Sequence, residues 1–230
     1  MPVSTVKVPE AMEPLFEQAE KYVKQYFSTR IENPQKGTIE IGGERYILVR
    51  AVSMSVNFFE YIKTLYPGLN EAEANNVTGS VLFDIAHGVG SNDALAFHKA
   101  MNLKTAIEKI SSGPVHFAYT GWAFVELGNE CRPSPDVNSY LVYDHPQSFE
   151  ADSWIKMERA SNSPVCFMNA GYSAGWGQVS FGVDITVKEV LCRAKGDKYC
   201  RFIMGHPSKI DGYVREYKEK NPELFGNGRV

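Results

Sequence analysis

Residues 164–204 read PVCFMNAGYSAGWGQVSFGVDITVKEVLCRAKGDKYCRFIM and carry the strongest structural signal in the chain. The first half is rich in small residues and opens with Pro164, which predicts a helix that packs closely against its neighbours. The second half predicts a β-hairpin that turns at Lys195-Gly196-Asp197. We therefore expect an antiparallel sheet in the second half of the chain, covered by helices.

This stretch also brings together residues that bind metals. Cys192 and Cys200 flank the turn almost symmetrically, so antiparallel pairing would place them opposite each other. Glu189 precedes Cys192 by three residues, and strict alternation would put the two on opposite faces, so a bulge or a strand end is expected between them. Cys166 would come from the start of the small-residue helix. Three thiolates and one carboxylate match the four ligands of a closed tetrahedral zinc site.

The spacing alone leaves other interpretations open. Cys192 and Cys200 lack the tight spacing of standard zinc motifs, so reduced cysteines that simply pack, or a disulfide between these two, fit as well. A reducing compartment favours a metal over a crosslink. Cys131 lies apart in a polar loop, where we expect an exposed spare thiol.

The rest of the chain predicts three regions. Residues 1–70 read as an extension of helix, hairpin around Gly42-Gly43 and second helix, which would serve as a packing or dimerisation arm. Residues 71–207 would form the main domain, and 208–230 a C-terminal helix with a frayed tail or linker. Within the main domain we expect a helix from Glu71 to about Met101 with a break near His87-Gly88, and strands from Val115 onward. The fold class is therefore α+β, an antiparallel helix-covered sheet with an N-terminal helix–hairpin–helix extension.

Composition narrows the partners. The 230 residues are 43% hydrophobic and 22% charged, with a net charge of -3, which offers no basic footprint for direct nucleic-acid binding. The N-terminus has no secretory signal, and no apolar run reaches the roughly 20 residues needed to span a bilayer. We expect a cytoplasmic protein that does not bind membranes.

The spaced elements of the stretch resemble the 4-vinyl-reductase-like domain, which also forms the N-terminal sensor of XylR-type aromatic-responsive sigma-54-dependent activators. The resemblance covers roughly Thr78 to Pro207 and rests on a series of positions in the same order: Cys166, Gly171-Tyr172, Gly175, Glu189, Cys192, Gly196 and Cys200. It implies an α/β domain that usually forms a homodimer. It also implies a structural Zn²⁺ held by the three cysteines and the glutamate.

The resemblance further implies a buried cavity for a small hydrophobic or aromatic molecule. His116 corresponds to a histidine that binds the phenolic hydroxyl in phenol-sensing members, whereas Tyr143-Asp144-His145 stands where those members have a tryptophan. Phenol itself is therefore not implied. Each aromatic residue is also compatible with an ordinary core position. The expected ligand-binding residues are His116, Phe117, Tyr119, Trp122, Tyr143, His145, Phe149, Tyr172 and Trp176.

The chain shows no dinucleotide fingerprint, phosphate-binding loop or Ser-His-acid arrangement, so we expect no enzyme. The predicted function is a ligand-sensing domain of a bacterial or archaeal signalling protein, with an output domain or partner protein. Two alternatives stay open: an adaptor or structural module of the same fold, and a tetrapyrrole-handling enzyme or carrier.

Overall fold

The computed structural model describes residues 3–225. The elements of the first half are β1 (Val6–Lys7), η1 (Glu10–Met12), α1 (Glu13–Phe27), β2 (Ile31–Asn33), β3 (Thr38–Ile41), β4 (Glu44–Tyr46), η2 (Ser53–Asn57), α2 (Phe58–Thr64), α3 (Glu71–Ala100) and α4 (Ala106–Tyr119). Those of the second half are β5 (Ala123–Leu127), β6 (Tyr140–Ser148), α5 (Phe149–Lys156), α6 (Phe167–Phe181), β7 (Thr186–Leu191), η3 (Arg193–Lys195), β8 (Cys200–Gly205), α7 (Ile210–Lys220) and α8 (Pro222–Phe225).

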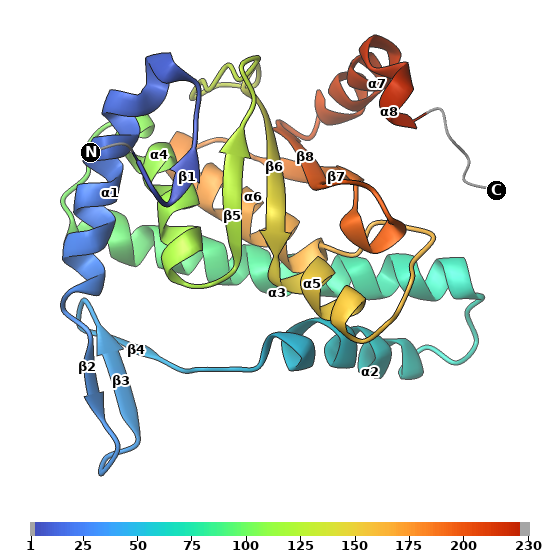
Figure 1. Cartoon of the computed structure of the whole chain (residues 1–230), viewed down its shortest axis with the longest axis horizontal. Coiled ribbons are helices and arrows are strands. Elements are labelled where there is room, and N and C mark those ends of the chain that lie inside the picture. The colour runs from blue at the N-terminus through green and yellow to red at the C-terminus, as the bar shows by residue number, and fades with distance from the viewer. Residues whose placement is uncertain (1–2, 226–230) are drawn as a thin grey trace.

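The main sheet has the order β1-β5-β6-β8-β7 (Figure 1). All its neighbours pair antiparallel except β1, which runs parallel to β5 through Val6 and Lys7. The predicted helix-covered antiparallel sheet is thus confirmed. The short β1 adds an edge strand from the N-terminus, so the sheet does not come from the second half of the chain alone.

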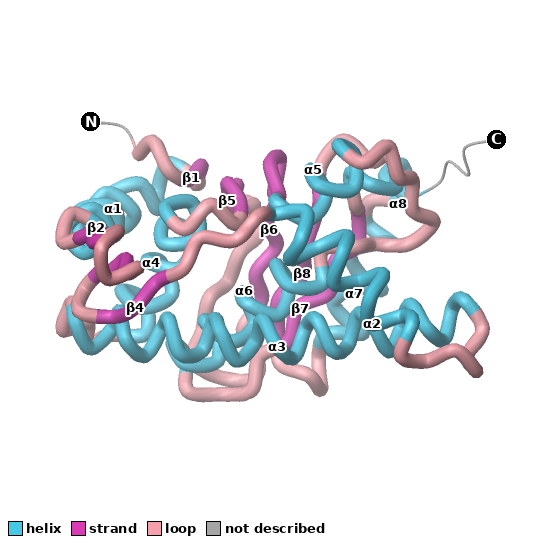
Figure 2. Tube along the Cα trace, turned by 90° about the horizontal axis from the view of Figure 1, so that it is seen from below, coloured by secondary structure: helices cyan, strands magenta, loops and turns pink. Residues whose placement is uncertain are grey.

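Helices α6 and α3 are stacked on one face of this sheet (Figure 2). Their close approach requires glycine, because a Cβ added to Gly171 would lie 2.1 Å from the carbonyl oxygen of Phe83 on α3. Gly90 of α3 is held equally close to Tyr172 of α6, at 2.3 Å. The expected close packing of the small-residue helix therefore takes the form of two interlocked helices.

Two expectations about local structure are wrong. The segment that contains His116 and Phe117 belongs to α4 and not to a strand. A capping box at Thr105 and Glu108 begins that helix, and this local signal outweighs the strand preference of Val115 to Tyr119. Helix α3 continues through His87-Gly88 without a break, because its glycines serve close contacts with α6 and the residues just before it.

The N-terminal region contains the predicted hairpin. Strands β3 and β4 turn at Gly42 and Gly43, whose φ angles of 62° and 84° favour glycine, and β2 extends them to a three-stranded sheet. The paired part ends at Tyr46, earlier than the apolar run that follows it. Helix α1 packs on α4, so this region also contacts the main domain.

The C-terminal helix is confirmed as α7, while the tail expected to fray lies partly outside the described residues, at 226–230. Across the described part of the chain, no helix combines the length and apolarity that a membrane crossing requires.

Candidate metal centre and ligand cavity

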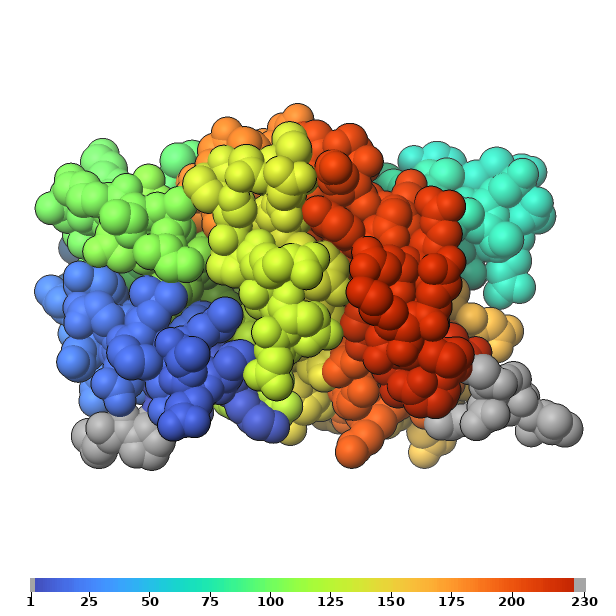
Figure 3. Space-filling model, turned by 90° about the horizontal axis from the view of Figure 1, so that it is seen from above, coloured from blue at the N-terminus to red at the C-terminus, as the bar shows by residue number. Residues whose placement is uncertain are grey.

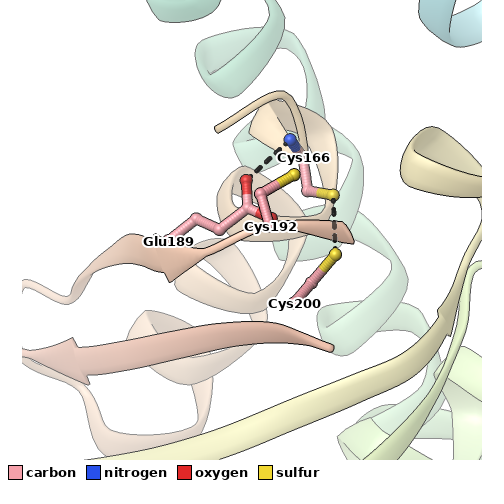
Figure 4. A group of neighbouring side chains, drawn as sticks. All are labelled: Cys166, Glu189, Cys192 and Cys200. Carbon is pink, nitrogen blue, oxygen red and sulfur yellow. Dashed lines mark hydrogen bonds between the residues drawn. The ribbon is translucent and has the colours of Figure 1, made fainter. Parts of the chain in front are cut away.

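Cys166, Glu189, Cys192 and Cys200 converge on one point (Figure 4). A ligand atom from each lies within 4.8 Å of those of the others, and the sulfurs of Cys166 and Cys200 are 3.6 Å apart. All three cysteines are free and buried. The structure thus brings together the four residues that the sequence selected, and as a group they could hold a metal ion.

The chain reaches this arrangement through three local features. Cys166 stands directly before α6, at its N-cap. The register between β7 and β8 shifts between Glu189 and Leu191, which is the bulge that the spacing to Cys192 requires. Past the end of β7, Asp197 accepts the backbone N–H of Cys192 at 2.8 Å and holds the turn in place.

The donor set fits a tetrahedral zinc ion. Zinc–sulfur bonds of about 2.3 Å in that geometry place sulfurs roughly 3.8 Å apart, close to the separation between Cys166 and Cys200. The Oε2 atom of Glu189 accepts the N–H of Cys166 at 2.8 Å, while its Oε1 atom is buried without a partner among the described residues. An unpartnered buried carboxylate oxygen is costly, and a cation beside it would remove that cost.

The electrostatics point the same way. Burial raises the pKa of the Cys166 thiol and of the Glu189 carboxyl. Hydrogen bonds from the other two thiols lower the pKa of Cys192. Four acidic groups this close cannot all lose their protons in a dry site without a positive ion. The nearby Arg193 does not supply that charge, because its guanidinium pairs with Asp152.

A second layer around the cluster escaped the sequence analysis. Glu150 is fully buried and accepts the N–H groups of Met168 at 3.0 Å and Asn169 at 2.8 Å, so it caps the start of α6. Burial raises the pKa of Glu150 to about 8. Ser148 caps α5 as expected and also lies 3.3 Å from the sulfur of Cys166. The signal for Glu150 was present in the sequence only as its place two residues after Ser148.

A cavity of about 120 Å³ lies between the N-terminal segment, α4, the sheet and α6. The segments that border it meet on the face shown in Figure 3, where the N-terminal part, the α4 region and the start of β6 adjoin one another. Its walls are almost wholly apolar. They are formed by Met12, Leu15, Phe16, Ile107, Ile110, Ser111, Gly113, Pro114, Phe117, Val125, Leu127, Cys131, Pro133, Leu141, Tyr143, Tyr172, Ser173, Trp176 and Met204.

Four of the nine expected ligand residues line this cavity: Phe117, Tyr143, Tyr172 and Trp176. His116, Tyr119, Trp122, His145 and Phe149 do not line it. Trp122 and Phe149 pack beside it, through ring contacts of Trp122 with Tyr172 at 4.7 Å and with Phe149 at 5.1 Å. Tyr119 is 37% exposed and stacks against Phe27.

His116 lies directly behind the cavity wall. Its Nδ1 atom is 3.1 Å from the hydroxyl of Tyr172, which donates at 2.8 Å to Asp93. Its Nε2 atom is buried without a partner among the described residues, and burial lowers its pKa to about 3. His116 is therefore neutral at physiological pH, and it reaches the cavity through Tyr172.

Tyr143 and His145 bring polar groups to the sheet side of the cavity. The hydroxyl of Tyr143, a cavity-lining residue, is buried without a geometric partner among the described residues, and burial raises its pKa. His145 is likewise buried with both ring nitrogens unpartnered in the described chain, but it packs against Phe202 at 4.4 Å between ring centroids. Tyr143 is thus the residue that offers a free hydrogen bond to an occupant of the cavity.

Cys131 does not behave as an exposed spare thiol. It is 9% exposed, its sulfur donates to the carbonyl of Val142 at 3.2 Å, and it lines the cavity. Burial raises its pKa to about 11, which leaves it a poor nucleophile. The cavity contributions of Cys131 and of α1 carried no local signal in the sequence, since only the folded chain brings them to the sheet.

Comparison with known proteins agrees with this geometry. Residues 148–206 match the family model of the 4-vinyl-reductase-like domain, so the chain contains a domain of this family. The matched segment includes all four residues of the cluster. The predicted resemblance is confirmed.

Two regulators are similar in sequence. The phenol regulator MopR of Acinetobacter guillouiae is 33% identical over 119 residues, which cover 51% of this chain and 21% of MopR. The transcriptional regulatory protein XylR of Pseudomonas putida is 26% identical over 176 residues, covering 76% of this chain and 30% of XylR. The chain thus spans less than a third of either relative. Both relatives are regulators rather than enzymes, in line with the expectation for this chain.

The fold has a solved counterpart. The crystal structure of the phenol-responsive sensory domain of the transcription activator PoxR with phenol superposes with a TM-score of 0.65 at 19% identity. The match covers 81% of this chain and 89% of that domain. It confirms the mixed architecture of antiparallel sheet and helices.

Proposed function

We propose that this chain senses a small aromatic molecule, held in the apolar cavity between α1, α4, α6 and the sheet. The observation that carries the proposal is the cavity itself, about 120 Å³ in volume and lined by Phe117, Tyr172 and Trp176. An engineered apolar cavity of about 150 Å³ is known to bind benzene, so one aromatic ring is the matching size. A tetrapyrrole is far larger than this space, which argues against the pigment-handling alternative.

The free hydroxyl of Tyr143 is the proposed polar anchor, with Ser173 as another hydroxyl of the wall. Because an apolar site with few polar groups gains specificity from those groups, a phenol would be preferred over an arene of the same size that lacks a hydroxyl. The relatives MopR and PoxR are described by their response to phenol, which supports an aromatic ligand here. His116, through Tyr172, would set the orientation of the wall.

Thermal unfolding with phenol and with toluene tests this proposal. Ligand at about 100 times its Kd stabilises by about 2.7 kcal/mol, which corresponds to a rise in Tm of roughly 5–10 °C for a domain of this size. We expect Tyr143→Phe to reduce the rise with phenol and to leave the rise with toluene unchanged. If neither compound, nor any other single-ring arene, raised Tm, the sensing proposal would be wrong and an adaptor module would be the better interpretation.

We also propose that Cys166, Glu189, Cys192 and Cys200 hold a structural Zn²⁺. The fit of the donor set and the unpartnered oxygen of Glu189 support this assignment. When bound, the ion would supply folding free energy and no chemistry, since four protein ligands leave no open position. The chain's own residues would tie the start of α6 to the β7–β8 hairpin.

Native mass spectrometry tests the metal assignment. The wild-type protein and Cys131→Ser, a matched buried cysteine outside the cluster, should each carry one zinc per chain. Cys192→Ser should lose the metal and unfold at lower temperature, because structural zinc contributes directly to stability. Equal zinc content in Cys192→Ser and wild type would refute the assignment.

The larger assembly is part of the same proposal. We propose a cytoplasmic homodimer in which 71–207 binds the ligand, 1–70 serves as the packing or dimerisation arm and 208–230 connects toward an output domain or partner protein. The similarity to parts of two longer regulators supports this division.

A further inference from the structure

The run Ile47-Leu48-Val49 is an exposed apolar stretch. These side chains are 74%, 76% and 55% exposed. The stretch continues β4, which is an edge strand of the three-stranded sheet β2-β3-β4. Figure 1 shows the chain leaving β4 as an extended segment that runs to the helical turn before α2. Consecutive large apolar side chains in water mark a surface that interacts with another molecule.

The backbone of this stretch is also free to pair. Residues of an antiparallel strand alternately face the neighbouring strand and face away from it with their N–H and C=O groups. The pairing of Ile41 with Glu44 across the two-residue turn directs the groups of Arg45 away from β3. The same alternation directs those of Ile47 and Val49 outward. Among the described residues, the backbone of 47–49 has no hydrogen-bond partner.

We propose that the segment Glu44–Arg50 pairs antiparallel with the same segment of a second copy of this chain, centred on Ile47. This inference rests on the homodimer proposed above and assigns its contact surface. In this register the outward-facing groups of Arg45, Ile47 and Val49 meet those of Val49, Ile47 and Arg45 of the partner subunit. Every free backbone group of the edge then finds a partner, and the exposed edge is removed.

Charge selects the second copy as the occupant. Glu44 and Arg50 are both exposed, and neither forms an ion pair among the described residues. Centring the pairing on Ile47 places Glu44 opposite Arg50 of the partner subunit. A two-fold axis repeats the contact, so the interface gains two opposite-charge pairs. A register shifted by one residue pairs neither charge.

Charge reversal tests the register directly by sedimentation equilibrium. The wild type should have twice the chain mass of 25.7 kDa. Glu44→Arg and Arg50→Glu should each weaken self-association by about tenfold or more, because each sets like charges opposite each other twice. The double variant E44R/R50E should dimerise as the wild type does. An equimolar mixture of the two single variants should form a heterodimer.

Lys36→Glu is the matched control. Lys36 is exposed at the turn between β2 and β3, and the change alters net charge as Arg50→Glu does. This variant should stay dimeric. A monomeric wild type would overturn both the homodimer and this surface. A dimer insensitive to either single reversal, or single variants that fail to form a heterodimer, would overturn the surface alone and leave the ligand and zinc proposals to their own tests.

Discussion

The interlock between α3 and α6 gives a sharp stability prediction at Gly171. A Cβ on Gly171 would lie 2.1 Å from the carbonyl oxygen of Phe83, and this distance must grow by about 1.3 Å to reach the 3.4 Å of ordinary contact. The obstacle is the backbone of a 30-residue helix, so no side chain can move aside. Gly171→Ala must therefore push the two helices apart.

The size of the effect follows from two opposing contributions. Overpacking of a close contact costs roughly 1–3 kcal/mol, whereas replacing a helical glycine by alanine favours the helix by up to about 1 kcal/mol. We expect Gly171→Ala to lower the free energy of unfolding by about 1–2 kcal/mol. Gly88→Ala on α3 is the matched control, because its Cβ would meet nothing within 4 Å, and it should raise stability by up to about 1 kcal/mol.

Equilibrium unfolding in urea measures both variants. The two should move the midpoint in opposite directions with an unchanged slope, since the surface exposed on unfolding stays the same. Gly171→Ala should also weaken the response to phenol, because the next residue, Tyr172, lines the cavity. If both variants shifted stability by the same amount and sign, the interlock would not exist as described.

Two further predictions concern buried charge. Since burial lowers the pKa of His116 to about 3 from an ordinary value near 6.5, the unfolded state binds its proton first as pH falls through that window. The free energy of unfolding should thus fall below about pH 6.5, by at most about 1.4 kcal/mol per pH unit for this residue, and urea titrations at several pH values should show a shallower slope in His116→Gln. Asp144→Asn should lower stability by about 1–3 kcal/mol in thermal or urea unfolding, because it leaves the largely buried guanidinium of Arg201 without its carboxylate. Asp211→Asn, which breaks the exposed pair with Lys188, should leave stability unchanged, and an equal loss in both variants would contradict this reasoning.

The metal cluster could be predicted from sequence because its geometry is largely local. Cys192 and Cys200 belong to one hairpin, and the turn at Gly196 sets them opposite each other whatever surrounds them. The position of Glu189 required a bulge, and pairing along the two strands provides it. Only Cys166 had to arrive from another element, and its place at the start of the small-residue helix could be recognised from Pro164 and the residues that follow.

The surroundings of His116 show where local signals were insufficient. Alternating Val, His, Phe and Tyr side chains suit a strand, and the capping box that begins α4 lies ten residues upstream. Burial against α1 and α6 then decides that this segment is helical, as propensity alone is a weak guide. The consequence for the site is direct, because on a helix Phe117 faces the cavity while His116 lies behind Tyr172.

The amino-acid order thus contained the hairpin, the small-residue helix and the four acidic ligands, since turn chemistry, glycine spacing and strand register act over a few residues. The cavity belongs to the tertiary structure alone. Its walls combine Met12 of the N-terminal segment, Cys131 of a loop and Trp176 of α6, which are far apart in the chain and have no shared periodicity. An empty volume depends on how well distant side chains fail to fill the space between elements, and no local pattern encodes that fit.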